Sequence, residues 1–430
     1  MKKGNFFRIT FILIIGSFIT KILGMFIKIV LTRLIKEEGM GLFMLIMPTF
    51  SLLCAISQMG FPTAISKLVA EDRFNNKKLV LGIIPISLVI NLFIIILLIF
   101  SSSFIANVLL KDPRTHLGIM AIGFVLPFVS ISSILRGYFF GKERMLPHVI
   151  SNILEDIIRL VLIIIFIPIL MNKGLEYVVA FLIIISIFSE LSSIIIFMVC
   201  APKKIQLKKD DFKLNHHNLK NIFSISIPTT GSRLIGSIGY FLEPIILTFA
   251  LSKSGYSNFF IVREYGIING YVLPLLLLPS FFTLAISQAI IPIISKSYSR
   301  NDLITTKRKI KQSIFFSLMI GIPATLIFML IPEIPLKLIY DTDIGINYIR
   351  TLAPIFLLHY IQAPLVSSLQ AMGKAKEAMF GTLIGMIFRT ITLFILSMAK
   401  IGIWGLVIAT SVNIVIVTSH QYIKIKKILN

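Results

Sequence analysis

The stretch AISQMGFPTAISK, residues 55–67, returns 230 positions later as AISQAIIPIISK, residues 285–296. The copies share the AISQ tetrapeptide and a proline four residues after its glutamine. Agreement of this length indicates that the chain contains a duplicated unit. The shared positions that define this repeat motif are Gln58, Pro62, Gln288 and Pro292.

Around the repeats, the chain is dominated by long apolar runs. Of its 430 residues 56% are hydrophobic and only 14% are charged, a composition outside the range of soluble globular proteins. About 20 apolar residues cross a bilayer core as a helix. We therefore predict an all-α integral membrane protein with about twelve transmembrane helices. Their expected ranges are 9–34, 40–66, 79–109, 116–140, 149–171, 175–200, 221–251, 265–295, 312–338, 346–371, 377–399 and 402–423.

Further matches divide these helices into two sets of six. Because six is an even number, both copies begin on the same side of the membrane, and the repeat is parallel rather than inverted. We predict a six-helix lobe at 1–200, a basic cytoplasmic linker at 201–220 and a second six-helix lobe at 221–430. The matches pair Gly16, Ser17 and Gly24 with Gly231, Ser232 and Gly239, Gly141-Lys142 with Gly373-Lys374, and Arg159 with Arg389.

The basic residues test this helix count, because lysine and arginine accumulate in cytoplasmic connections. The formal net charge is +23, with 42 lysines and arginines, and they cluster at the N-terminus and in every second connection. The alternation predicts cytoplasmic termini in a multi-pass protein of the plasma membrane. It also argues against nucleic acid as a partner, which would require a folded basic face.

No motif in the sequence indicates an enzyme. The P-loop signature and the HExxH motif are absent, the six histidines are scattered, and the two cysteines lack metal-binding spacing. We expect no cofactor, no metal site and no bound nucleotide. A membrane-embedded glycosyltransferase, polymerase or ligase would need a long outside loop or paired carboxylates, and no outside loop exceeds about 15 residues.

Ionisable residues at membrane depth are costly, so they indicate a cavity, a partner or the interior of the helix bundle. Lys21 and Lys28 lie on one face of the first helix, and Arg233 lies in the equivalent polar stripe of the seventh. Lys21 and Arg233 are nearer the middle of the membrane and would give a central cavity positive potential. Such a cavity suits an anion such as phosphate. The alternative is that these cations serve helix packing.

Lys28 and Glu243 occupy equivalent positions of the two halves, 215 residues apart. We predict that they pair across the cleft near its outer end and act as an outer gate. The alternative is a static salt bridge, or snorkelling of each side chain to the outer interface. Reversing both charges tests the pair, because a restored transport phenotype supports it and an absence of rescue contradicts it.

The fifth helix begins with a polar cluster, in which Glu155, Asp156 and Arg159 share one face. Glu155 and Arg159 are four residues apart and can pair locally, which favours a structural role. Arg389, the repeat equivalent of Arg159, has no such acidic neighbours. It therefore either pairs elsewhere or faces the cleft.

Two cytoplasmic segments carry a family resemblance: LRGYFFGKERMLPHVISNILEDIIRL, residues 135–160, and LQAMGKAKEAM, residues 369–379. They resemble connections in the polysaccharide-exporter, stage V sporulation protein B-like branch of the multidrug/oligosaccharidyl-lipid/polysaccharide (MOP) superfamily, which is related to lipid II flippases. The resemblance implies a V-shaped, two-lobed, MATE-like fold that alternates between inward and outward openings. It also implies transport of a polyprenyl-pyrophosphate-linked saccharide between leaflets.

In similar lipid II flippases, cations on helices 1, 2 and 8 contact the pyrophosphate. Here helix 1 offers Lys21 and Lys28, helix 2 has no cation before Lys67, and helix 8 offers only Arg263 at its outer end. Those relatives usually have fourteen helices, and a groove formed by the last two would be missing from a chain of twelve.

The resemblance and the cations together predict a flippase for an anionic lipid-linked saccharide of cell-wall, spore-cortex or surface-polysaccharide assembly, with one chain as the transport unit. The coupling ion, Na⁺ or H⁺, is open, because the membrane potential alone could move an anionic headgroup outward at about 2.3 kcal/mol per charge per 100 mV. The alternative is a cation-coupled MATE-type drug or metabolite exporter, which would need membrane-embedded carboxylates.

Overall fold

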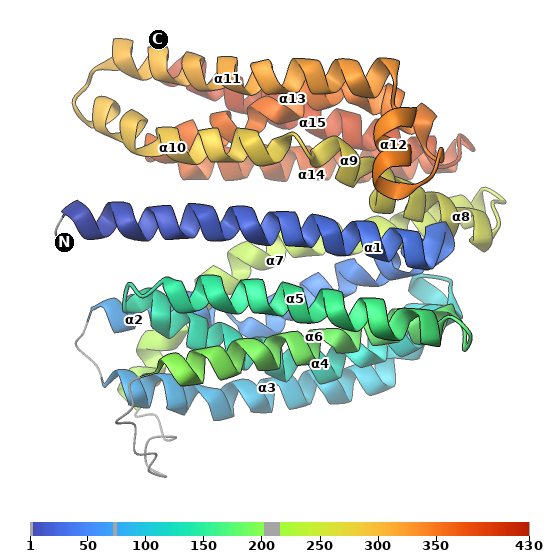
Figure 1. Ribbon diagram of the computed structural model, residues 1–430, viewed down its shortest axis with the longest axis horizontal. Helices are drawn as coiled ribbons and strands as arrows, with labels where there is room; N and C mark the ends of the chain where they lie inside the picture. Colours follow the sequence, from blue (N-terminus) through green and yellow to red (C-terminus); the bar gives the residue numbers. More distant parts are fainter. Residues whose placement is uncertain (1–2, 72–74, 202–215, 430) are drawn as a thin grey trace. The chain divides into compact units, whose positions relative to one another are not determined.

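The structure is a computed structural model that describes residues 3–71, 75–201 and 216–429 (Figure 1). Within them, ten helical segments are long and apolar enough to cross a membrane, which confirms the all-α membrane architecture. The longest segment, Phe18–Ala70, covers most of the predicted span 9–34 and all of the predicted span 40–66. Lys36, at φ 55° and ψ −165°, interrupts the helix between those two spans. The count of twelve crossings stays a prediction.

Two compact units divide the chain, Met1–Pro244 and Ile245–Asn430. The boundary falls within α7, His216–Lys253. The predicted linker at 201–220 lies largely outside the described residues, so the predicted domain limits stay a prediction. The other α-helices of the first unit are α1 (Lys3–Gln58), α2 (Phe61–Ala70), α3 (Asn76–Phe104), α4 (His116–Gly141), α5 (Leu146–Leu170) and α6 (Leu175–Cys200).

The second unit contains the end of α7 and eight further α-helices in the described chain. A π-helical stretch, Ile267–Val272, joins the first two of them. Their bounds are α8 (Asn258–Gly266), α9 (Leu273–Leu277), α10 (Ser280–Ser299), α11 (Leu303–Leu330), α12 (Glu333–Tyr340), α13 (Ile346–Ala371), α14 (Ala375–Met398) and α15 (Trp404–Leu429).

The duplication is visible as an equal spacing of elements in the two units. Helices α4 and α13 are both 26 residues long, and α13 begins and ends 230 positions after α4. The turns that follow them repeat the same backbone hydrogen bonds. Lys142 N–H donates to the Tyr138 carbonyl in one turn, and Met372 N–H donates to the Ser368 carbonyl in the other. The same offset of 230 relates Arg159 to Arg389.

This spacing corrects one predicted match of the repeat. Glu143 and Gly373, at φ 57° and 73°, occupy the equivalent left-handed positions of the two turns. The sequence match of Gly141-Lys142 with Gly373-Lys374 is therefore displaced by two residues. The match fails because the two glycines have different structural roles. Gly373 adopts the left-handed conformation in its turn, whereas Gly141 is the last residue of a helix.

The AISQ motif ends a helix in the first copy and continues one in the second. After Gln58, Met59 and Gly60 both have positive φ, 42° and 63°, and α2 begins at Phe61 with Pro62 in its first turn, where the missing proline N–H costs no hydrogen bond. The second copy has no glycine in this place, and α10 runs through the motif. The side chains of Gln288 and Pro292 lie outside the described part of the structure.

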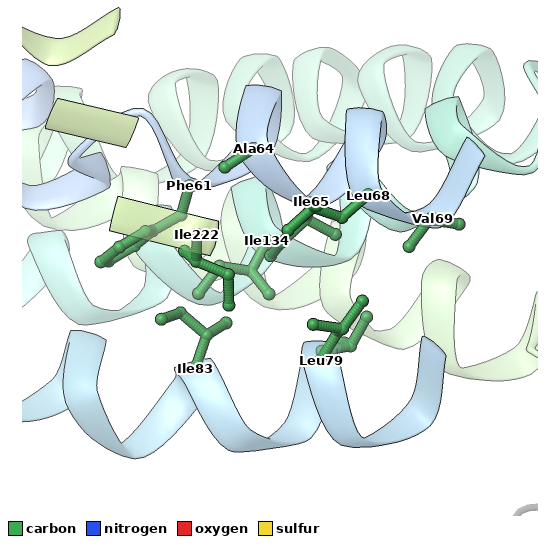
Figure 2. Packing of buried hydrophobic residues seen from close by; sticks show 10 residues of the cluster. Phe61, Ala64, Ile65, Leu68, Val69, Leu79, Ile83, Ile134 and Ile222 are labelled. Carbon is green, nitrogen blue, oxygen red and sulfur yellow. The ribbon is translucent and has the colours of Figure 1, made fainter. Parts of the chain in front are cut away.

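A hydrophobic core fixes the orientation of α2 (Figure 2). Phe61, Ile65 and Leu68 on one face of α2 are at most 3% exposed, and they pack against residues of α3, α4 and α7. Close van der Waals packing of this kind holds helices together in lipid. Because the helical period places polar residues on the opposite face, α2 turns Lys67 away from the core. The core partners that Figure 2 labels outside α2 are Leu79, Ile83, Ile134 and Ile222.

Candidate functional site

A pocket of about 600 Å³ opens on the polar face of α2 in the first unit. Cations from three helices line it, namely Lys67 of α2, Arg136 of α4 and Arg233 of α7. The described residues that line the pocket include no carboxylate, so the potential inside it is positive. The other lining residues are Gln58, Pro62, Thr63, Ser66, Ala70, Ser133, Phe140 and His148.

Two glycines of α4 bring this helix against α2. A Cβ atom on Gly137 would lie 2.6 Å from the Pro62 carbonyl oxygen, and one on Gly141 would lie 2.7 Å from the Ser66 carbonyl oxygen. Such small residues, four apart, allow membrane helices to approach backbone to backbone. Arg136, the neighbour of Gly137, is thereby placed over the same pocket as the polar face of α2.

The third cation, Arg233, reaches the pocket beside the turn that joins α1 to α2. A Cβ atom on Gly60 would lie 2.7 Å from the Ser226 carbonyl oxygen of α7, so α7 packs directly on this turn. Further along α7, Arg233 Nη1 donates a 3.1 Å hydrogen bond to Gln58 Oε1. The predicted cation Arg233 and the repeat residues Gln58 and Pro62 therefore meet in one pocket.

Arg136 connects the pocket to a charged network behind it. Its Nη2 lies 3.2 Å from Glu155 Oε1, and the two side chains are 27% and 13% exposed. Its buried Nε has no hydrogen-bond partner in the described structure. A guanidinium carries five donors in a planar fork, so the contact with Glu155 leaves donors for a ligand in the pocket.

His148 stands at the start of α5 and completes the wall of the pocket. Its ring packs edge-on against Phe140, with 4.7 Å between ring centroids. The buried Nδ1 atom has no hydrogen-bond partner among the described residues. An imidazole N–H held in this way can donate to an anion without any change in its charge.

The network itself differs from the local pair that the sequence suggested. Glu155 takes Arg136, on α4, as its ion-pair partner in place of Arg159, and it also accepts a hydrogen bond from Ser193 on α6. Arg159 lies 3.9 Å from Asp156, three residues before it. The reason is tertiary packing, because α4 and α6 offer Glu155 partners that are better placed than its own helix does.

The predicted cations of the first helix lie outside the cationic pocket. Lys21 is exposed and Lys28 is half-buried. Lys28 lines a smaller cavity of about 220 Å³ in the first unit, together with Arg159 and mainly apolar residues. The structure thus separates Lys28 from Arg233, and the role of Lys21 and Lys28 toward a substrate stays a prediction.

The functional roles predicted for Glu243 and Arg389 stay predictions. Glu243 is buried, at 5% exposure, and its pairing with Lys28 as a gate is not tested by any described contact. Arg389 lies on α14 in the second unit, whereas Glu155, Asp156 and Arg159 lie on α5 in the first.

Sequence reasoning missed four residues of the site: Lys67, Arg136 and His148 in the pocket wall, and Glu190, which accepts a hydrogen bond from Ser132 behind it. A signal for two of them was present, because Arg136 and His148 both lie in the segment 135–160 that carried the family resemblance. Glu190 lies well inside the apolar run of the sixth helix, whereas the other carboxylate of that helix, Glu176, lies in its first turn. A carboxylate inside such a run is costly in lipid.

The family profile described as polysaccharide biosynthesis protein matches residues 6–298, which include the whole pocket and network. The chain belongs to this family. A second profile, described as MatE, matches residues 269–395 of the same chain. With its many apolar helices, the family member is a multi-pass membrane protein.

Several Bacillus subtilis (strain 168) proteins resemble the family member over most of their lengths. Stage V sporulation protein B is 34% identical over 441 residues, which cover 100% of this chain and 85% of the relative. Sporulation protein YkvU is 27% identical over 439 residues, covering 99% and 96%. Lipid II flippase MurJ is 22% identical over 467 residues, covering 99% and 83%.

Solved structures show that the family member has the fold of MOP superfamily transporters. An inward-facing multidrug resistance MATE family transporter superposes with a TM-score of 0.76 at 15% identity, covering 95% of this chain and 94% of the other. A MOP superfamily transporter from Pyrococcus furiosus, described as having a binding pocket of reverse polarity, gives 0.60 at 18% identity, covering 98% and 95%. The predicted MATE-like fold class is confirmed.

Proposed function

We propose that this protein is a flippase that moves an anionic, polyprenyl-pyrophosphate-linked saccharide from the inner to the outer leaflet of the plasma membrane. The saccharide is a precursor of cell wall, spore cortex or surface polysaccharide. The mechanism is alternating access, in which the pyrophosphate is bound on one side and released on the other.

One observation carries the proposal: Lys67, Arg136 and Arg233 converge from three helices on one pocket, and the described lining has no carboxylate. Arginine binds phosphate oxygens through a bidentate fork, and lysine binds them as a point charge. A pyrophosphate offers several such oxygens. The hydroxyls and ring donor of the pocket can complete its coordination.

The relatives support the same substrate class. The family description names polysaccharide biosynthesis, and one relative is described as a lipid II flippase. A capsular polysaccharide biosynthesis protein, CapF of Staphylococcus aureus, is 23% identical over 300 residues. These names support a lipid-linked saccharide as cargo, and the positive pocket supports an anionic linkage at its end.

A second candidate is a cation-coupled MATE-type exporter. The MatE profile match and the half-buried carboxylates Glu155 and Glu190 favour it, because membrane-embedded carboxylates are the groups that bind coupling cations. The wall of the pocket argues for the flippase, since a cationic drug would meet three positive charges there.

A depletion strain separates the two candidates. We expect undecaprenyl-linked saccharide intermediates to accumulate on the inner leaflet when the protein is depleted. The wild-type gene should clear them, and a variant with Lys67→Gln, Arg136→Gln and Arg233→Gln should not. A matched variant that loses three exposed cations of α11, Lys307→Gln, Arg308→Gln and Lys311→Gln, should clear them. If no intermediates accumulate and export of a cationic dye falls, the flippase proposal fails.

The topology and the transport unit in this proposal have their own tests. A reporter that is active only in the cytoplasm should be active when fused to the C-terminus, and an inactive fusion would contradict cytoplasmic termini. Light scattering of the detergent-solubilised protein should give one chain of 48.3 kDa after subtraction of the detergent, whereas twice that mass would contradict a monomeric unit.

A further inference from the structure

Behind the cationic pocket, three helices of the first unit hold two carboxylates in a connected set of hydrogen bonds. Ser132 and Arg136 are four residues apart on α4, and Glu190 and Ser193 are three apart on α6. Ser132 donates to Glu190, Ser193 donates to Glu155 of α5, and Arg136 pairs with Glu155 at 3.2 Å. Arg136 is therefore a member of both this network and the pocket.

The charges of the network do not balance when every group is ionised. Glu155, Asp156 and Glu190 carry three negative charges, and Arg136 and Arg159 carry two positive ones. Glu155 repels Glu190 electrostatically, whereas Arg136 and Arg159 attract it. An excess negative charge away from water is costly. One bound cation would balance the network, and the proton is the cation that needs no additional ligands.

Neighbouring elements contribute few other charged or titratable groups. Cys54 of α1 lies in the field of Glu190, and His148 of α5 lies in the field of Arg136. Lys28 of α1 shares the smaller cavity with Arg159. Helix α3 presents uncharged partners to α4, such as Ser87, which hydrogen-bonds Ser130 of that helix.

Of the charged residues in the network, only Arg159 recurs in the second copy of the repeat, as Arg389. At the offset of 230 residues, valine (Val366) stands in place of Arg136 and glycine (Gly385) in place of Glu155. The helices of the second copy pack without charges at these two positions. The charged network therefore has a role that the duplicated scaffold does not require.

We propose that Glu155 and Glu190 form a proton-binding site that is linked to the anion pocket through Arg136, which the two sites share. An anion in the pocket brings negative charge next to Arg136 and weakens its hold on Glu155. One of the two carboxylates then takes up a proton from water. Anion and proton therefore bind together, and each raises the affinity for the other. This inference rests on the anion pocket of the proposed function.

Calorimetry of the full, detergent-solubilised chain tests the linkage. The probe is methanedisulfonate, a pyrophosphate analogue whose own charge does not change near neutral pH. Titrations in two buffers with different ionisation enthalpies give the number of protons taken up. We expect uptake of up to about one proton per anion, and an affinity about fivefold or more tighter near pH 6 than near pH 8.

Three variants assign the proton. Glu190→Gln should abolish proton uptake and leave an affinity that changes less than about twofold over the same pH range. Glu176→Gln, in the first turn of α6, is the matched control and should behave as wild type. His148→Gln removes a pocket donor and should weaken anion binding, but the uptake per bound anion should be retained. This separates the carboxylates from the titratable group in the pocket wall. If Glu190→Gln does not fold, Glu155→Gln removes the other member of the pair.

The outcomes separate this inference from the proposed function. Anion binding without proton uptake would overturn the inference and leave the flippase intact. Uptake that persists in both glutamate variants, or that disappears in a His148→Gln chain that still binds the anion, would also overturn it. A wild-type chain that binds neither methanedisulfonate nor pyrophosphate would overturn the anion pocket and the inference together.

Discussion

Gly137 sets the distance between α4 and α2 at the scale of a single residue. The methyl group of Gly137→Ala would lie 2.6 Å from the Pro62 carbonyl oxygen and 2.9 Å from the Pro62 Cα, and backbone atoms cannot yield as a side chain can. We expect the free energy of unfolding to fall by about 1–3 kcal/mol. The unfolding temperature in detergent measures the loss.

Gly236 of α7 is the matched control for this substitution. No heavy atom lies within 4 Å of a Cβ atom placed there, and alanine favours a helix interior over glycine by about 1 kcal/mol. Gly236→Ala should therefore leave the unfolding temperature unchanged or raise it. Equal destabilisation by both substitutions would contradict the close contact of α4 with α2.

The three pocket cations should contribute separately to anion binding. Replacing Lys67, Arg136 or Arg233 with glutamine should weaken pyrophosphate binding about tenfold or more each, since a charge-assisted hydrogen bond contributes about 1.5–3 kcal/mol. Arg136→Lys keeps the charge but loses the fork, so it should lie between wild type and Arg136→Gln. Titration calorimetry measures these affinities, with Arg308→Gln of α11 as the control. Equal affinities in all variants would exclude the pocket as the binding site.

At the scale of an element, the break between α1 and α2 depends on Gly60. Gly60→Ala places a side chain at a left-handed φ of 63° and 2.7 Å from the Ser226 carbonyl oxygen. We expect it to lower the free energy of unfolding by more than the roughly 1–2 kcal/mol of a left-handed alanine. Gly255 has φ 92°, and no heavy atom lies within 4 Å of a Cβ atom placed there. Gly255→Ala should therefore lose only the conformational contribution to the free energy of unfolding. Thermal unfolding of both variants measures the difference, and equal losses would contradict the packing of α7 on this turn.

Asp302 caps the start of α11 and lies just outside the membrane-spanning segment Leu303–Leu330. Asp302 accepts a 2.9 Å hydrogen bond from Thr305 N–H, and its hydrogen bonds with the Thr305 side chain and backbone lower the pKa of this carboxyl below its ordinary value. The carboxylate therefore stabilises the folded state above the unfolded pKa, and this contribution is lost as the pH falls through the folded pKa.

Asp302→Asn should keep the cap but remove its dependence on acid, because asparagine also caps helices well. Asp302→Ala should lose the cap at every pH. Unfolding temperatures measured between about pH 3 and 7 check both variants. An Asp302→Asn chain that weakens in acid as much as wild type would contradict a titrating cap.

The sequence predicted the positions of those helices that depend only on residues within one segment of the chain. Apolar runs gave the long helices, and the repeat gave the equal spacing of α4 and α13. It did not predict that the AISQ motif would break one helix and continue another, because that depends on one glycine after Gln58 in the first copy. The two-residue shift between the turns at Glu143 and Gly373 likewise depends on which residue adopts positive φ.

At the scale of the whole molecule, the fold and family were predictable and most of the site was not. Arg233 was singled out from its polar stripe, but its neighbours Lys67 and Arg136 come from other helices. Their convergence requires the close approach of α2 and α4 at Gly137, which no pattern within one helix reveals. Glu190 was missed for a similar reason, because its partners lie on α4 and α5.

Transport of a defined lipid by the purified protein tests the proposed function most directly. Proteoliposomes would carry an undecaprenyl-pyrophosphate-linked saccharide in one leaflet, and an impermeant lectin would report its appearance in the other. We predict that wild type and the α11 triple-glutamine variant translocate the lipid, whereas the chain with Lys67→Gln, Arg136→Gln and Arg233→Gln does not. Translocation at the wild-type rate after loss of these three cations, or none by the wild type, would contradict the proposal.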